Sequence, residues 1–189
     1  TTNSLIFVEV ISSDAEAVSA GRGHSMVLKQ DGSVWTTGDN TYGQLGSDSN
    51  ANTLVFVQVV ASGVEAVAAG FDHSMILMQG GSVRATGHNN YGQLGDGTTT
   101  DQNGFVEVVA SGAAAVAASE TYSMVLNEDG SVLATGANGE GQLGDGSNTD
   151  RNTFEEVVSS GVGVTAMALG GSFSILLTED GSVLATGSN

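Results

Sequence analysis

Apolar and polar positions repeat along this chain with a fixed period. An apolar run opens at Phe7, Phe56, Phe105 and Phe154, each 49 residues after the one before it. The quartet Gly-Gln-Leu-Gly recurs with the same period, at 43–46, 92–95 and 141–144. A serine that precedes an aliphatic run also repeats, at 25, 74, 123 and 174, with two extra residues before the last copy. A period of this length indicates supersecondary units that bury their apolar faces by packing on one another.

Within one period, the pattern predicts four short strands. In the second unit, residues 56–60 alternate and are rich in β-branched side chains, 65–69 are small, and 73–78 are apolar. Residues 82–86 return after a Gly-Gly turn, and the other units have Asp-Gly there, a pair that favours tight hairpins with positive φ. An alanine-rich helix over 113–118 is the alternative. The neighbouring glycines and the valine that recurs at this place in three units favour a strand.

Four short strands per period, with glycine turns at fixed offsets, are typical of a β-propeller blade. The predicted fold class is therefore all-β, with blades of about 49 residues in a single repeat array over 1–189. The units are placed at about 7–55, 56–104, 105–153 and a shorter 154–189. We expect them to form part of a larger ring. A closed four-bladed ring, in which Phe7–Val10 pairs with the strand at Ser182–Thr186, is the alternative.

The positions that keep an aliphatic side chain from unit to unit are the predicted core. We expect these side chains to be largely buried, because each unit must cover its apolar face with a neighbour. They are Val18, Val67, Val116, Met26, Met75, Met124, Leu28, Leu77, Leu126, Leu45, Leu94 and Leu143.

Four stretches of the first unit carry a specific pattern: Ala-Gly-Arg-Gly-His-Ser at 20–25, Asp-Gly-Ser-Val-Trp at 31–35, Gly-Asp-Asn at 38–40 and the quartet at 43–46. The pattern recurs across nearly the whole chain and resembles the regulator-of-chromosome-condensation repeat family. The resemblance implies a propeller of seven blades, which at this period needs about 343 residues. Family members usually carry proline just before the outer strand. This chain of 189 residues has no proline, so it resembles a divergent branch.

The charge balance narrows the kinds of partner. Four basic and 21 acidic residues give a net charge of −17, which repels nucleic acid and anionic lipid and favours a cationic protein partner. No apolar run approaches the length of about 18 residues that spans a bilayer, so no membrane insertion is predicted. We do not expect a free, closed monomer. The charge opposes self-stacking and favours an unlike partner, or a further part of the same polypeptide, over a homodimer.

The candidate chemical groups favour structural roles. His24 and His73 align with Tyr122 and Phe173, so this position needs a planar ring and not a titratable nitrogen. The loops 96–101 and 145–150 each carry two carboxylates, but the pattern fits turns capped by Asp and Asn better than a calcium loop. The chain has no cysteine and no glycine-rich phosphate loop. We therefore predict no catalytic site, no metal site and no cofactor.

Function in repeat proteins concentrates where the units differ, because the shared residues build the scaffold. The variable loop positions proposed to bind a partner are Asp39, Thr41, Tyr42, Phe71, Asp72, His88, Asn90, Tyr91, Glu120 and Glu140. The predicted function is a non-enzymatic protein-interaction or scaffold module, as a subunit or segment of a larger assembly. The resemblance implies an alternative, a guanine-nucleotide exchange factor for a small GTPase. A propeller-type enzyme inhibitor is a further one.

Overall fold

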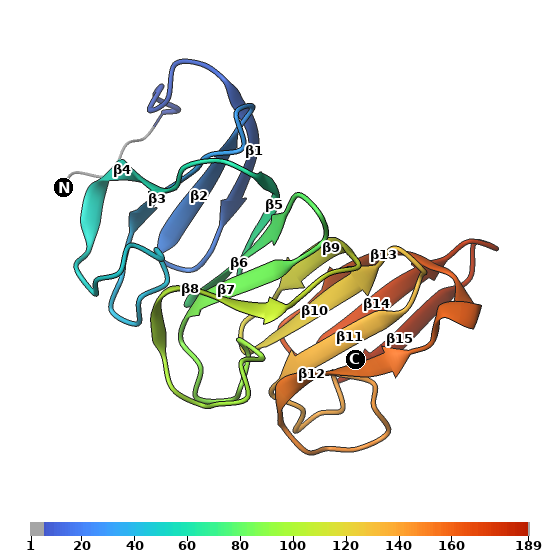
Figure 1. The fold of residues 1–189 in the computed structure, drawn as a ribbon. Helices are drawn as coiled ribbons and strands as arrows, with labels where there is room; N and C mark the ends of the chain where they lie inside the picture. Colours follow the sequence, from blue (N-terminus) through green and yellow to red (C-terminus); the bar gives the residue numbers. More distant parts are fainter. Residues whose placement is uncertain (1–5, 189) are drawn as a thin grey trace.

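A computed structural model of the protein describes residues 6–188. These residues form β-strands joined by turns and loops, and one short 3-10 helix (Figure 1). In chain order the elements are β1 (Ala15–Ala20), β2 (His24–Lys29), β3 (Val34–Gly38), β4 (Thr53–Val60), β5 (Val64–Ala69), β6 (His73–Met78), β7 (Val83–Gly87), β8 (Gln102–Val109), β9 (Ala113–Ala118), β10 (Tyr122–Asn127), β11 (Val132–Gly136), β12 (Arg151–Val158), η1 (Ser160–Val162), β13 (Val164–Leu169), β14 (Phe173–Thr178) and β15 (Val183–Gly187).

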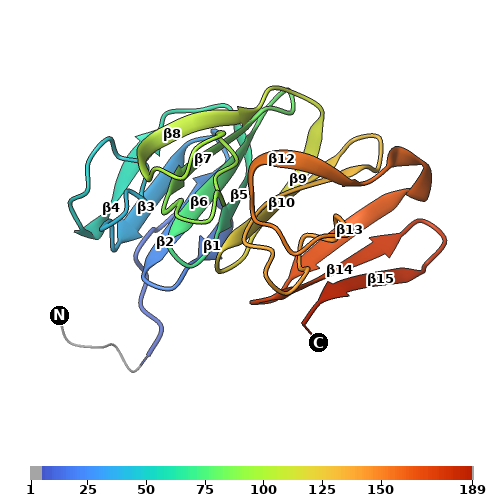
Figure 2. The ribbon, with the colours of Figure 1, turned by 90° about the horizontal axis from the view of Figure 1, so that it is seen from below.

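The strands form four antiparallel sheets, each built from strands that follow one another in the chain. The sheets are β1-β2-β3-β4, β5-β6-β7-β8, β9-β10-β11-β12 and β13-β14-β15. They stand side by side in sequence order, with the first and fourth at the two ends of an open row (Figures 1 and 2). The predicted all-β fold of propeller blades is confirmed, and the blades form part of a ring and not a closed one.

The sheets are offset from the repeat of the sequence. The strand that opens the second unit, β4, pairs with β3 and so completes the first sheet. In the same way β8 completes the second sheet and β12 the third. Each sheet therefore takes its outermost strand from the start of the following sequence unit, and that strand links it covalently to the next sheet.

The first apolar run is an exception to this rule. The pattern predicts a strand at Phe7–Val10, but residues 7–14 form no strand. The physical reason is that an outermost strand pairs with the third strand of the sheet before it, and no sheet precedes this run among the described residues. The pairing with Ser182–Thr186 that would close a four-bladed ring is also not formed, because the third strand of the fourth sheet pairs only with β14 within residues 6–188.

The hairpin turns follow the predicted chemistry. In the first sheet, the amide of Gly32 donates to the carbonyl of Lys29 at 2.9 Å, and Gly32 has a φ of 76°. The side chain of Asp31 caps the turn by accepting the amide of Ser33 at 2.9 Å. Only the glycine of the Asp-Gly pair takes the left-handed conformation, which glycine adopts without steric cost.

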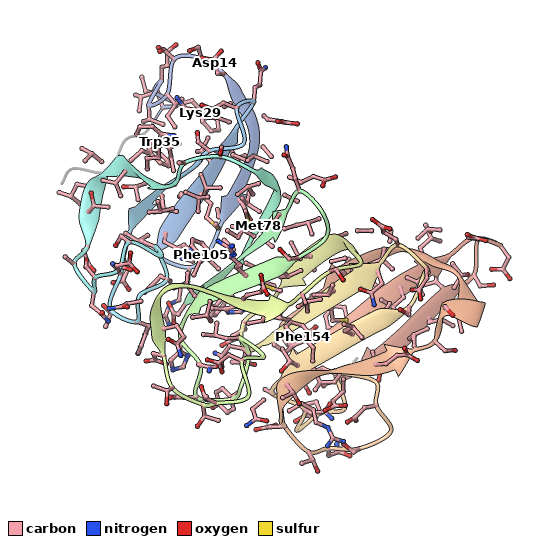
Figure 3. The ribbon with its side chains drawn as sticks, in the orientation of Figure 1. Asp14, Lys29, Trp35, Met78, Phe105 and Phe154 are labelled. Atoms are coloured by element: carbon pink, nitrogen blue, oxygen red, sulfur yellow. The ribbon has the colours of Figure 1, made fainter. Side chains whose placement is uncertain are left out.

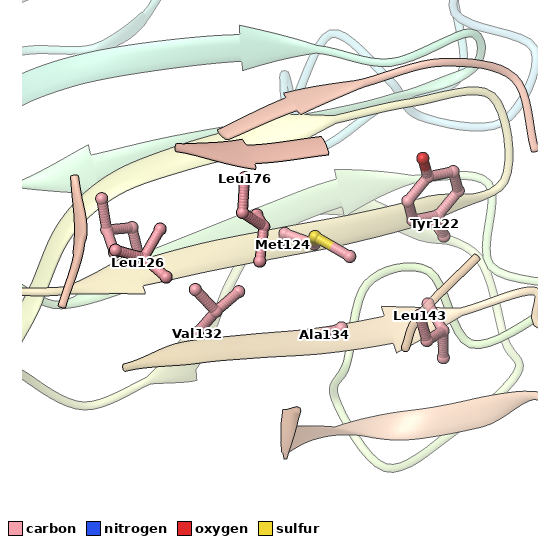
Figure 4. Close-up of a cluster of buried hydrophobic side chains, with 8 residues drawn as sticks. Tyr122, Met124, Leu126, Val132, Ala134, Leu143 and Leu176 are labelled. Atoms are coloured by element: carbon pink, nitrogen blue, oxygen red, sulfur yellow. The ribbon is translucent and has the colours of Figure 1, made fainter. Parts of the chain in front are cut away.

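The apolar core lies between neighbouring sheets. Met26, Leu28 and Val34 of the first sheet are buried against Val64 and Ile76 of the second. Equivalent clusters join the second sheet to the third and the third to the fourth. Figure 4 shows the last of these, in which Leu176 lies over Met124. Each sheet thus buries one face only because the next sheet covers it.

The predicted core is mostly confirmed, with one error. Every predicted methionine and leucine is at most 6% exposed, and Val67 and Val116 are partly buried in the clusters. Val18 is 76% exposed, so its prediction was wrong. Its side chain lies on the face of the first sheet that is turned away from the second, and no sheet of the described chain covers that face.

We expect Leu94→Ala to destabilise the fold by about 2–5 kcal/mol, because the side chain is fully buried between two sheets and its removal leaves a cavity. Urea unfolding measures this. The matched control is Leu54→Ala, since Leu54 is 81% exposed and its truncation should cost less than about 0.5 kcal/mol. Equal losses in the two variants would contradict the assignment of the core.

Candidate interaction site

The two sets of variable loops lie at the same end of the sheets. The first connection, 21–23, follows β1, and the long loop 39–52 follows β3. Because His24 at the start of β2 lies opposite Gly38 at the end of β3, both loops emerge together. The same pairing in the second and third sheets joins His73 to Gly87 and Tyr122 to Gly136. The ten predicted partner-binding residues therefore share one face, which we call the loop face.

A hollow of about 410 Å³ opens on this face, where the first strands of the sheets converge. Its floor is made of small side chains at the strand ends, and its rim carries Arg22, Phe71 and Glu120. Phe71 is 40% exposed. The guanidinium of Arg22 lies 5.9 Å from the centre of the Phe71 ring and forms a 2.8 Å ion pair with the nearly buried Asp72. This hollow, which we call the axial hollow, thus combines the exposed ring of Phe71 with the exposed carboxylate of Glu120.

The long loops are built around an asparagine that sequence reasoning missed. The side chain of Asn40 donates to the carbonyls of Ser49 and Ala51 and accepts the amide of Leu45 at 2.9 Å. Asn89 and Asn138 make the equivalent bonds. All three are fully buried. Their recurrence at one period is the signal that the sequence offers for them. Each amide fixes a long loop of the loop face.

Two of the predicted residues, Tyr42 and His88, meet between the first and second loops. The rings of Tyr42 and His88 lie with their centres 4.4 Å apart. The Nδ1 of His88 is 3.2 Å from the amide nitrogen of Gln93. Asp39 accepts both the amide and the hydroxyl of Thr41, which leaves this carboxylate committed to its own loop. Its pKa is lowered chiefly by the bond from the Thr41 hydroxyl.

The remaining candidates lie further along the face. Asn90 and Tyr91 line a second hollow of about 280 Å³, shared with Asp150 and Arg151 of the third long loop. Tyr91 is 45% exposed. Glu140 is exposed in the same long loop as Asp150. Of the ten candidates, Phe71 and Glu120 line the first hollow and Asn90 and Tyr91 line the second, whereas the other six line neither.

The acidic loops use their carboxylates internally. Asp145 accepts hydrogen bonds from Asn138, Ser147 and Arg151, and its ion pair with Arg151 is 2.6 Å long. Burial raises the pKa of Asp145, but these donors outweigh it and lower the pKa to about 2. Asp96 is bound in the same way by Asn89, Thr98 and Gln102. Within residues 6–188, no three or more acidic or histidine side chains gather as a metal site.

A polar contact joins each sheet to the next beneath the loop face. The Nε2 of His24 lies 2.8 Å from the hydroxyl of Ser74, and that hydroxyl donates to the carbonyl of Gln44 at 2.7 Å. Because the hydroxyl has a single hydrogen, the imidazole must be the donor to it. His73 repeats this arrangement with Ser123. At the third junction the direction is reversed: the Ser174 hydroxyl donates to the hydroxyl of Tyr122, which itself donates to the carbonyl of Phe173 at 2.6 Å. We call it the ring–serine contact. The predicted planar ring therefore also has a polar role, which its alignment with Phe173 concealed.

Family models decide the classification. The model of the regulator of chromosome condensation (RCC1) repeat matches residues 31–77, and a second model with the same description matches 15–44, 64–93 and 164–189. The chain belongs to the RCC1 repeat family. No curated protein sequence matches the chain significantly. No helix among the described residues is long and apolar enough to cross a membrane.

Solved structures show the same fold for RCC1 repeats. Human WBSCR16 superposes with a TM-score of 0.83 at 28% identity, over 92% of this chain and 47% of that one. The structure of Kap60 bound to yeast RCC1 (Prp20) matches with a TM-score of 0.79 at 18% identity, over 94% and 45%. Prp20p from Saccharomyces cerevisiae matches with a TM-score of 0.60 at 18% identity, over 90% and 56%. The chain spans about half the length of the structures that it matches.

The buried histidine predicts a pH dependence of stability. Burial lowers the pKa of His73 from its ordinary value of 6.5 to about 3. As the pH falls from 6.5, the unfolded chain gains a proton that the folded protein excludes, so the free energy of unfolding falls. We expect a loss of roughly 2 kcal/mol between pH 6.5 and 4.5, measured by urea unfolding.

The control is His73→Phe, because Phe173 occupies the equivalent place against an equivalent glycine, Gly170. The variant loses the hydrogen bond to Ser123 and should be less stable at pH 7. Between pH 6.5 and 4.5, its free energy of unfolding should nevertheless fall by about 2 kcal/mol less than that of the wild-type protein. Parallel curves for the two proteins would contradict the low pKa of His73.

Proposed function

We propose that the chain is a non-enzymatic protein-interaction module whose loop face binds a cationic protein partner. The single observation that carries this proposal is the convergence of the variable residues of three sheets around the axial hollow, with Phe71 exposed and Glu120 beside it. An aromatic side chain in a concave site is the usual anchor of a protein interface.

The support of the loops favours binding without rearrangement. Buried asparagines hold each long loop, and the ring–serine contacts hold the sheets beneath them. A surface fixed in this way loses little conformational entropy when a partner binds. The net charge of −17 speeds the encounter with a basic protein.

Relatives with this fold provide independent support. Yeast RCC1 (Prp20) has been crystallised with Kap60 bound, and the structure of Prp20p was described with its binding properties to Gsp1p and histones. The RCC1 repeat propeller is therefore a scaffold that binds proteins. We infer the same class of activity for this chain.

We expect this chain to bind histones, used as a defined cationic probe, with an affinity that falls as salt is raised. Phe71→Ala and Glu120→Lys should each weaken binding by about tenfold, measured by fluorescence anisotropy. The matched control is Glu179→Lys, which makes the same charge change in the β14–β15 turn at the other end of the sheets. If Glu179→Lys weakens binding as much as Glu120→Lys does, the interaction reflects net charge and not the loop face.

A nucleotide-release assay separates this function from exchange activity. We expect the chain to leave the rate of GDP release from a small GTPase unchanged. Acceleration that Phe71→Ala removes would replace the interaction-module proposal with an exchange factor that uses the same face.

A further inference from the structure

One position distinguishes the second long loop, 88–101, from the first and the third. In the first loop, the side chain of Asn50 donates to the carbonyl of Thr41 at 3.1 Å and ties the two arms of the loop together. The third loop repeats this bond with Asn148, which donates to the equivalent carbonyl at 2.9 Å. The second loop has Thr99 at the same place. Because threonine has no amide and a shorter side chain, the arms of this loop are not tied there.

The same asparagine also reaches the next sheet at the first junction. The amide of Asn103, at the start of β8, donates to the side chain of Asn50 at 3.3 Å. At the second junction the equivalent of Asn103 is Asn152 of β12, which donates instead to the carbonyl of Gly97 at 3.0 Å. Within residues 6–188, the place beside Thr99 is therefore spanned neither from its own loop nor from the next sheet.

This place is the second hollow of the loop face, with a volume of about 280 Å³. We call it the inter-loop hollow. It is lined by Asn90, Tyr91, Thr99, Asp150, Arg151 and Asn152. The second and third sheets, which supply these residues, each have a neighbouring sheet on both sides (Figure 1). Both walls of the hollow thus lie inside the row of sheets and not at one of its ends.

The two walls are fixed to one another. The amide of Gly97 donates to the carbonyl of Asn152 at 2.8 Å. Phe154 of β12, labelled in Figure 3, packs on Gly95, where an added Cβ would collide with the phenyl ring. The buried amide of Asn89 holds the second loop from within. Walls held in this way lose little conformational entropy when a ligand binds between them.

The aromatic ring of Tyr91 forms one side of the hollow and is 45% exposed. Its equivalent at the first junction, Tyr42, lies against the ring of His88 with the ring centres 4.4 Å apart. The residue that corresponds to His88 in the third sheet is Ala137, which has no ring. Tyr91 therefore makes no ring contact within the described chain, and its face can receive the apolar side of a ligand.

The other side of the hollow offers both acceptors and donors. One carboxylate oxygen of Asp150 accepts the amide of Asn138 at 2.7 Å, and the other has no bond within residues 6–188. Arg151 binds Asp145 through Nε at 2.8 Å and Nη2 at 2.6 Å, so its Nη1 is left as a donor. Asn90 adds a carboxamide, which both donates and accepts. The hollow thus suits a ligand whose own groups do both.

The charges of the hollow argue against an ionic ligand. Asp150 and the net charge of −17 repel an anion. Arg151 is the adjacent residue in the same wall and repels a cation. A neutral ligand with several hydroxyl groups meets neither penalty, since each hydroxyl both donates and accepts. A pyranose ring carries such hydroxyls around a face of C–H bonds, which is the shape that an exposed tyrosine ring can receive.

We propose that the inter-loop hollow binds a neutral hexose unit, with its C–H face on Tyr91 and its hydroxyls on Asp150 and Arg151. The site does not rest on the protein binding proposed for the axial hollow. For so small a neutral ligand we expect a Kd of about 1 mM. Because no charge is neutralised on binding, the affinity should not change with salt.

Isothermal titration with glucose, galactose and mannose, and with neutral oligosaccharides that end in each of them, tests the proposal. Binding of a free hexose near the expected Kd supports it. An oligosaccharide that binds at least tenfold more tightly than its terminal hexose identifies the ligand as part of a glycan, and equal affinities identify the free sugar. If none of these compounds binds at concentrations up to about 20 mM, the proposal is wrong.

The repeat itself supplies the variant that closes the hollow. Thr99→Asn installs the residue of the first and third loops and should weaken hexose binding at least tenfold. Thr100→Asn is the matched control, because it makes the same change at the next position, which does not line the hollow, and it should leave binding unchanged. Tyr91→Ala should also weaken binding at least tenfold, whereas Tyr91→Phe keeps the ring and should retain it. Urea unfolding of each variant checks that the fold is intact.

Hexose binding that survives both Thr99→Asn and Tyr91→Ala would place the sugar elsewhere and overturn the proposal. So would a tetralysine peptide that binds where the sugars do not and is lost in Thr99→Asn, because the hollow would then belong to a cationic protein partner. The salt dependence separates this site from the axial hollow, since histone binding should fall as salt is raised and hexose binding should not. Failure of either proposal therefore leaves the other to be judged by its own measurement.

Discussion

The packing of each sheet on its successor is the contact from which the rest of the structure follows. A single four-stranded sheet of this chain has two apolar faces. Because its strands are only five to eight residues long, the sheet alone has little with which to cover these faces. Met26, Leu28 and Val34 become buried only when Val64 and Ile76 of the next sheet arrive. Since the contact repeats with small and aliphatic side chains at the same places, stability accumulates from nearest-neighbour junctions.

The polar groups beneath the loop face depend on the same junctions. The hydroxyl of Ser74 accepts a hydrogen bond from the imidazole of His24 in the sheet before it. It donates its own hydrogen to the carbonyl of Gln44 in the quartet of that sheet. Thr86 bonds the carbonyl of Gly43 in the same neighbour. The loops therefore cannot be ordered sheet by sheet. The residues proposed to bind a partner rest on a scaffold whose loops and sheets are fixed together, and the proposed interaction site is a property of adjacent units.

The repeat of the sequence predicted the blades, the hairpin turns and most of the core, because identical units fold alike when they have identical neighbours. It failed where the neighbours differ. Val18 and Phe7 match partly buried positions of other units, yet both are exposed, since no sheet precedes them among the described residues. The grouping of residues on the loop face could not be predicted from the sequence alone. Phe71 and Glu120 are 49 residues apart, and only the strand order brings them to one hollow. The role of Asn40 could have been predicted from the sequence, because this residue recurs in each unit. A short polar residue in a glycine-rich loop, however, more commonly has a role in turns.

The fourth sheet differs from the others in one further respect, and the difference bears on how firmly its outer face can hold a neighbour. At every internal junction the ring position carries a polar group, in His24, His73 or Tyr122, that is hydrogen-bonded to a serine of the next sheet. The fourth sheet has Phe173 there. A junction on this face would therefore lack the buried hydrogen bond of the internal ones. Because a buried hydrogen bond contributes about 1 kcal/mol, such a junction would be weaker than the internal ones.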